Sequence, residues 1–242
     1  MDLLSQKIER SELQKGDHMY TWRKAHTYSH HGIFIGEGRL IHFVNPKADN
    51  IQFSAAVFGS SSGSGKKKKK APCPKWYCGS EKVAGSGVRM SCIDCFMKKG
   101  SLYQFKYEAS PRFLVNKGRG GTCTMAKSDS PEEVVHRATY LYENGYAEYD
   151  LMNNNCEDFA LYCKTGLWST DKSYQGRSSQ ANMVHPSSEE EKIKNPLKLL
   201  AKAFHRSCTK RENKDLGVRE DVDKVPVEEL SSFLLALSLA DL

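Results

Sequence analysis

Two kinds of residue in this chain are spaced in a way that could support chemistry: a cysteine at an expected helix start, and two histidines twelve residues apart. Cys156 follows three asparagines in the stretch NNNCEDFALYCKTG. A thiolate is a nucleophile, and the unpaired N–H groups of a helix N-terminus lower the pKa of a thiol. A nucleophilic cysteine also needs an imidazole as general base and a third polar group to orient that imidazole. His30 and His42 are the candidates for those two roles.

Capping residues place Cys156 in the first turn of a helix. Asn155 suits the N-cap, two acidic residues follow Cys156, and Gly166 suits the C-terminal stop. The acidic side chains point away around the helix, so we expect the helix dipole and a nearby imidazole to outweigh them. A structural interpretation is equally open. Cys156 begins an i, i+3, i+4, i+7 pattern, typical of one buried helix face, that continues through Phe159, Ala160 and Cys163.

The two histidines fall in an expected β-hairpin, HTYSHHGIFIGEGRLIHFVNP. Because side chains alternate between the two faces of a strand, the loop length decides whether the histidines meet. A two-residue loop would put them on opposite faces. A three-residue loop, 36–38, places His42 across from Gly32, on the face that also carries His30. We expect the three-residue loop, with Gly38 as its left-handed residue.

Four further cysteines form two close pairs within CPKWYCGSEKVAGSGVRMSCIDC. They are Cys73, Cys78, Cys92 and Cys95. Close pairs of cysteines can hold a tetrahedral zinc ion from two turns, and four thiolates leave no open coordination position. We therefore expect a structural zinc here. The alternative is a set of reduced, partly buried cysteines in an insertion.

Composition limits the class of protein. With 242 residues, 39% of them hydrophobic, the chain can build one main core. Its formal net charge is +7, but the lysine run 66–70 supplies five of these charges and leaves +2 for the rest, so we expect no nucleic-acid partner. The first residues lack the apolar core of a signal peptide, and no window approaches the apolar length of a membrane helix. A cytoplasmic location is expected.

Other segments are less specific. The stretch 59–70, GSSSGSGKKKKK, lacks the spacing of a phosphate-binding loop and is interpreted as a solvated loop that could touch anionic lipid. Residues 101–110 predict a strand that returns to the main sheet. Residues 130–145 predict a capped helix with His136 on its surface. The amphipathic stretch around Leu197 and the apolar C-terminal tail are expected to pack on the core, with a partner or a membrane surface as the alternative.

Three separated motifs occur along the chain, with the two histidine motifs before the cysteine motif: YSHHGIFIG, then IHF, and later NNCEDFALYCKTG. Over residues 17–166 the chain resembles the lecithin:retinol acyltransferase (LRAT) family, in particular its plant NC-domain branch, which includes proteins of the Lead-sensitive type. The resemblance implies an α+β, circularly permuted papain-like (NlpC/P60-type) fold, in which an antiparallel sheet packs with helices. We expect this domain at 1–166, with a low-complexity and Cys-rich insertion at 59–95, and a C-terminal extension with amphipathic segments at 167–242.

The resemblance also implies a mechanism. His30 occupies the general-base position, His42 the orienting position, and Cys156 the position of a nucleophile that carries an acyl thioester. The substrate would be a glycerophospholipid acyl ester, reached by peripheral membrane contact, and the chemistry would need no cofactor. His31 stands where animal relatives commonly have Trp, and Asp158 where they commonly have His. The alternative is a catalytically silent, zinc-braced module for lipid or protein interaction, with a metal or redox response. The identity of any protein partner does not follow from the sequence.

Overall fold

The computed structural model describes residues 6–23, 28–46, 73–116, 121–151, 154–169 and 215–240. The lysine run 66–70 and the amphipathic stretch around Leu197 lie outside these described residues, as does most of the low-complexity part of the expected insertion.

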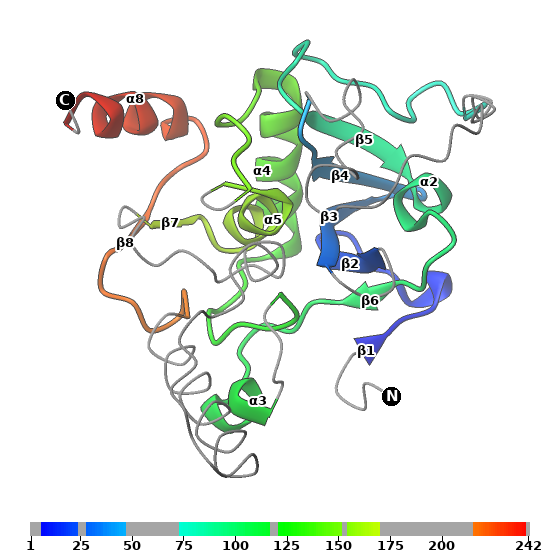
Figure 1. Cartoon of the computed structure of the whole chain (residues 1–242), viewed down its shortest axis with the longest axis horizontal. Helices are drawn as coiled ribbons and strands as arrows, with labels where there is room; N and C mark the ends of the chain where they lie inside the picture. Colours follow the sequence, from blue (N-terminus) through cyan, green and yellow to red (C-terminus); the bar gives the residue numbers. More distant parts are fainter. Residues whose placement is uncertain are drawn as a thin grey trace, which may run out of the picture.

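A six-stranded antiparallel sheet forms the centre of the fold, in the order β1-β6-β2-β3-β4-β5 (Figure 1). Its strands are β1 (Gln6–Lys7), β2 (His18–Arg23), β3 (Tyr28–Gly36), β4 (Arg39–Phe43), β5 (Val88–Cys92) and β6 (Tyr103–Gln104). The predicted return strand is confirmed, although only the two residues of β6 pair with β2. The short 3-10 helix η1 (Arg10–Glu12) lies between β1 and β2.

Helices cover both faces of the sheet (Figure 1). Helix α2 (Ile93–Met97) packs on one face, and α4 (Pro131–Asn144) and α5 (Cys156–Thr165) pack on the other. The remaining helices of the described residues are α3 (Pro111–Asn116) and α8 (Leu230–Ala240). On one face, Ile41 of β4 packs with Val134 of α4 and Phe159 of α5 in the main core. On the other face, the neighbouring Leu40 packs with Phe96 of α2. Strand alternation thus gives β4 two buried faces, which explains its almost continuous apolar sequence.

Helix α4 follows the predicted capping pattern. Its N-cap, Ser130, accepts a hydrogen bond from the backbone N–H of Glu133 (3.3 Å), and Pro131 is the first helical residue. Gly145, with φ of +91°, ends the helix. His136 lies on the exposed side, as predicted, and pairs with Glu228 at 2.7 Å.

The β3–β4 hairpin brings the two histidines to one face through a β-bulge and not through the expected three-residue loop. Its turn has two residues, Glu37 and Gly38, both with positive φ, so the predicted three-residue loop is wrong. A β-bulge at Ile35 supplies the odd residue instead, because Phe34 pairs with Leu40 while the next pair is Gly36 with Arg39. The predicted register beyond the bulge is confirmed: a Cβ on Gly32 would lie 3.1 Å from the Cβ of His42.

The described part of the C-terminal segment packs on the core. Strands β7 (Leu167–Ser169) and β8 (Val222–Lys224) form a separate two-stranded sheet. The hydroxyl of Tyr162 in α5 donates to the carbonyl of Val225 (2.9 Å), and Val225 joins the main core with Val227 and Leu230. Packing on the core, the first alternative for this tail, is therefore confirmed for these residues.

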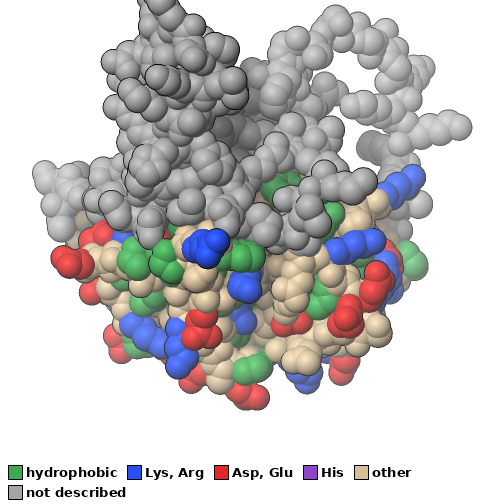
Figure 2. Space-filling model, turned by 90° about the horizontal axis from the view of Figure 1, so that it is seen from below, with side chains coloured by type: hydrophobic (Ala, Val, Ile, Leu, Met, Phe, Trp, Pro, Cys, Tyr) green, Lys and Arg blue, Asp and Glu red, His purple; other side chains and the backbone are tan. Residues whose placement is uncertain are grey.

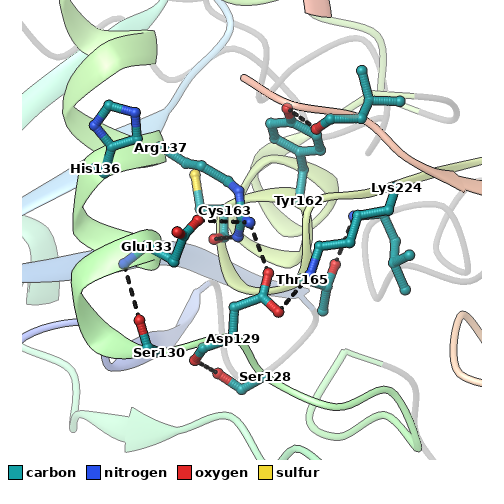
Figure 3. Close-up of polar contacts among 12 residues, drawn as sticks. Ser128, Asp129, Ser130, Glu133, His136, Arg137, Tyr162, Cys163, Thr165 and Lys224 are labelled. Carbon is teal, nitrogen blue, oxygen red and sulfur yellow. Dashed lines mark hydrogen bonds and ion pairs between the residues drawn. The ribbon is translucent and has the colours of Figure 1, made fainter. Parts of the chain in front are cut away.

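A buried arginine links this segment to the helices (Figure 3). Arg137 of α4 donates to the carbonyl of Cys163 in α5 (3.1 Å) and forms an ion pair with Asp129 (2.7 Å). Asp129 also pairs with Lys224 of β8 at 2.7 Å. One carboxylate thus joins α4 and β8, and Arg137 joins both to α5.

Candidate active site and cysteine cluster

Two imidazoles lie in contact on the α2 side of the sheet. Nε2 of His30 in β3 is 2.9 Å from Nδ1 of His42 in β4, and Nε2 of His42 is 2.8 Å from the hydroxyl oxygen of Ser91 in β5. The ring of Phe96 packs against both imidazoles, with centroid distances of 5.2 and 5.6 Å. Gly32 leaves room for this arrangement, since a Cβ there would lie 3.0 Å from the Phe96 ring.

Both imidazoles are neutral at neutral pH. Burial, then His42 and Arg23, lower the pKa of His30 well below its ordinary value. Burial, followed by the charges of Arg89 and Arg23, lowers the pKa of His42 to about 3. A neutral imidazole is the form that can accept a proton, so the environment of the pair suits a general base.

Cys156 is the first residue of α5 and is fully buried. The side-chain oxygen of Asn155 accepts a hydrogen bond from the backbone N–H of Glu157 (2.8 Å), and Asp158 accepts one from the N–H of Asn155 (3.0 Å). This capping box confirms that Cys156 lies in the first turn. The alternative buried-face pattern is also present, because Phe159 and the other two members of the pattern are buried in the main core.

Arg23 of β2 interacts electrostatically with the thiol of Cys156 and with both imidazoles. Its guanidinium donates to the carbonyls of Met97 (2.8 Å) and Phe96 at the end of α2. Burial lowers the pKa of Arg23, and the ionised forms of Tyr28 and Cys156 act in the opposite direction. The charge of Arg23 also lowers the pKa of both imidazoles. Arg23 therefore couples electrostatically to all three residues of the sequence-predicted site.

A second set of buried polar residues lies on the opposite face of β3. Nδ1 of His31 is 2.9 Å from Nε2 of His18, and Nε2 of His31 is 2.7 Å from the hydroxyl of Ser29. His18 in turn contacts the hydroxyl of Tyr107 at 2.8 Å. A carboxylate oxygen of Glu157 lies 3.7 Å from Nε2 of His31. This set, which we call the rear network, connects the first turn of α5 to β3.

The four paired cysteines come together as the sequence predicts. Their sulfur atoms all lie within 4.8 Å of one another, and Sγ of Cys92 is 3.9 Å from that of Cys73 and 3.7 Å from that of Cys78. Tetrahedral zinc with Zn–S bonds of about 2.3 Å separates its sulfur ligands by about 3.8 Å. The backbone N–H of Cys92 also donates to Sγ of Cys78 (3.4 Å). With Cys95 of α2 as the fourth member, the cluster could bind a metal ion.

Sequence patterns did not reveal Ser91 or Arg23. Ser91 reaches His42 through the pairing of β4 with β5, although the two residues lie 49 positions apart in the chain. Arg23 acts through the end of α2, about seventy positions further along the chain. Contacts of this kind depend on tertiary structure and leave no local periodicity in the sequence.

The described surface carries charges of both signs. Figure 2 shows Lys and Arg side chains interspersed with Asp and Glu over the described part of one face. None of the helices in the described ranges has the length and apolarity needed to cross a membrane. The expected lack of nucleic-acid binding and the cytoplasmic location stay predictions.

The architecture defines the class of protein. An antiparallel sheet with helices packed on it, histidines on its strands and a cysteine at a helix start is a papain-like α+β arrangement of the NlpC/P60 type, circularly permuted because the histidines precede the cysteine in the chain. The family model "Lecithin retinol acyltransferase" matches residues 11–169, and the chain belongs to this LRAT family. The resemblance to the family in the sequence is thereby confirmed.

A curated plant relative supports the same conclusion. Protein LEAD-SENSITIVE 1 of Arabidopsis thaliana is 39% identical over 239 residues, which cover 96% of this chain and 91% of the relative. No solved structure matches the chain.

Proposed function

We propose that this protein transfers acyl groups from glycerophospholipids through a thioester on Cys156. The acceptor would be water, an amine or an alcohol. The observation that carries the proposal is the hydrogen-bonded chain from His30, which is half-buried, through His42 to Ser91, which are both buried. Membership of the LRAT family and the position of Cys156 in the first turn of α5 support it.

The hydrogen-bond chain suggests where the protons lie. If Nε2–H of His30 donates to Nδ1 of His42, and Nε2–H of His42 donates to Ser91, then Nδ1 of His30 carries a lone pair. In this tautomer His30 takes the proton of the Cys156 thiol, and the thiolate attacks the ester carbonyl. The C–O bond of the ester then breaks, and the leaving alkoxide of the lysophospholipid takes the proton from His30. In the second half, His30 deprotonates the acceptor, which displaces Cys156 from the thioester.

Access to lipid by peripheral contact is part of this proposal. Helix α8 exposes Leu235 and Leu239, which are 62% and 63% exposed. An apolar helix face at the surface can enter the interfacial region of a bilayer. The chemistry itself needs no cofactor.

We also propose that the cysteine cluster holds a structural zinc ion. The sulfur spacing fits a tetrahedral ion, and four thiolate ligands suit zinc. Metal analysis of the purified full chain should give about one zinc per chain, and Cys73→Ser should lower this value. A Cys123→Ser variant, which changes a buried cysteine outside the cluster, should retain the metal. Zinc content near zero in the wild type would contradict the proposal.

The second candidate is a silent module for lipid or protein interaction. The complete burial of Cys156 among core residues favours it, because a structural cysteine shows the same burial. The relative's name refers to sensitivity to lead, and a thiolate cluster of this kind could also take part in a metal or redox response.

The discriminating experiment is intact-protein mass spectrometry after incubation with phosphatidylcholine vesicles. A fatty-acyl adduct that hydroxylamine removes should form on the wild type and be absent from Cys156→Ala and His30→Ala. Cys163→Ala, a change of a buried cysteine two turns further along the same helix, should retain the adduct. If no variant and no wild-type sample gains an adduct or turns over lipid, the silent module is the better explanation.

A further inference from the structure

The cysteine cluster and the imidazole pair share one short piece of chain, residues 91–97. Ser91, which contacts His42 at 2.8 Å, immediately precedes Cys92. Cys92 ends β5 and is the N-cap of α2, where it is almost fully buried. Any ion that fixes Cys92 therefore also limits the movement of the residue that orients His42.

Helix α2 carries a second connection from the cluster to the pair. Cys95 lies in this helix, and the next residue, Phe96, packs its ring against both imidazoles. Phe96 is 1% exposed and cannot leave this position without opening the α2 side of the core. The Phe96 ring thus restricts the movement of the two imidazoles and keeps them in their T-shaped arrangement.

The same helix also binds Arg23. The carbonyls of Phe96 and Met97 accept from its guanidinium, and Lys98 ends the helix in the left-handed conformation, with φ of +49°. Helix α2 has only five residues, far fewer than the roughly 12 to 15 that an isolated helix needs in water. Its N-cap makes no side-chain capping bond. The helix must therefore be held by its contacts, and two of its anchor points are cysteines of the cluster.

We infer that a metal ion in the cysteine cluster positions the imidazole pair, with Ser91 and α2 as the connecting parts. The inference rests on the metal site and on the role of the pair given above. Release of the ion would free Cys92 and Cys95, and Ser91 and Phe96 would lose their fixed places against His42. The rear network would keep its structure, because it lies on the opposite face and has no member in residues 91–97.

The test compares imidazole signals of the full chain with and without zinc. Two-bond 1H–15N spectra report the tautomer of each histidine. Removal of zinc by a chelator under reducing conditions should shift or broaden the signals of His30 and His42 and leave those of His18 and His31 unchanged. Added zinc should restore the original spectrum. The inference is wrong if the signals of His30 and His42 do not change, or if those of all four histidines change together, which would indicate general unfolding.

Variants separate the metal from the connection. Cys95→Ser should reproduce the effect of the chelator on His30 and His42. Ser91→Ala should keep the zinc content of the wild type but change the His42 signals, and it should slow thioester formation at least about tenfold. Ser91→Thr, which retains the hydroxyl, should restore both. Unchanged His42 signals in Ser91→Ala would overturn the connecting role of Ser91.

The spectra do not depend on lipid turnover. Metal-dependent signals in a protein that forms no acyl adduct would support this inference while refuting acyl transfer. A protein that forms the acyl adduct, but whose His30 and His42 signals do not change when zinc is removed, would support acyl transfer and refute this inference.

Discussion

Arg23 is a cation whose charge acts on the imidazoles of His30 and His42. It donates to two carbonyls at the end of α2, and its charge adds to burial in lowering the pKa of His30 and His42. A half-buried cation in this place disfavours the imidazolium form and favours a thiolate. At the scale of single residues, Arg23 therefore affects the base and the nucleophile in opposite ways.

The pH dependence of thioester formation follows from this placement. Because the pKa of His30 is lowered, its neutral form persists at pH values below 6.5, the ordinary pKa of histidine. We expect the acid limb of the pH–rate profile to lie well below pH 6.5. Arg23→Gln should move this limb to higher pH, since one of the causes that lower the pKa of His30 is removed.

Arg23→Lys is the matched control, because it keeps the positive charge and should leave the acid limb near its wild-type position. Rates of acyl-adduct formation measured from pH 4 to 8 give the three profiles. A wild-type limb close to pH 6.5, or identical profiles for the wild type and Arg23→Gln, would contradict this account.

At the scale of elements, α4 and α5 offer a comparison of two helix caps. Ser130 caps α4 and Asn155 caps α5, each through one bond from the side-chain oxygen to a backbone N–H. Loss of such a cap costs about 1 kcal/mol of stability. Only the α5 cap lies beside the proposed nucleophile.

We expect Ser130→Ala to lower the free energy of unfolding by about 0.5 to 2 kcal/mol and Asn155→Ala to lower it by more, because Asn155 is buried and its amide also donates to the carbonyl of Leu151 (3.0 Å). Thioester formation should slow markedly in Asn155→Ala alone, because fraying of the first turn of α5 displaces Cys156. Urea titrations and adduct-formation rates of both variants provide the measurement. Equal rates in the two variants would show that the α5 cap serves stability only.

The sequence predicted those features of the fold that depend on local patterns. The caps of α4 and α5, the return strand and the pairing of the four cysteines were all predictable, since each has a local signal. The hairpin shows the limit. For the two histidines to share a face, the hairpin needs one residue more than a regular ladder with a two-residue turn. Either a longer turn or a bulge at Ile35 supplies that residue. The order of the residues does not distinguish the two, because the choice depends on how β3 packs.

At the scale of the whole molecule, three buried histidines and the half-buried His30 make stability sensitive to acid. Burial is the first cause that lowers the pKa of His18, His30, His31 and His42, and for His31 and His42 the value is about 3. A depressed pKa means that the neutral form is favoured by folding. The resulting stability is fully present above pH 6.5 and is lost as the pH falls toward the folded value.

We therefore expect the free energy of unfolding to fall between pH 6.5 and pH 4, with a slope of up to about 1.4 kcal/mol per pH unit for each histidine. Asp129, Asp221 and Glu228 also have lowered pKa values, and the stability that they contribute is lost as the pH falls below their ordinary values of 3.8 and 4.5, so the loss between pH 6.5 and pH 4.5 comes mainly from the histidines. Urea midpoints at pH 7, 5.5 and 4.5 test the expectation.

His31→Gln should flatten this slope, because the variant has one buried titrating group fewer. Stability that stays constant from pH 7 to pH 4.5 would show that the buried imidazoles gain protons without opening the structure.

Because of the bulge at Ile35, the effect of an insertion or deletion in the hairpin on the orientation of His42 depends on whether its length is odd or even. Between Gly32 and His42, a change of one residue exchanges the face on which His42 lies, unless the bulge absorbs it, whereas a change of two residues preserves the face. Among length variants that keep the bulge, even changes should therefore preserve activity and odd changes should abolish it. Ile35 is the position at which a single deletion should be tolerated, because loss of the bulged residue leaves a regular two-residue hairpin in which Gly32 still lies across from His42.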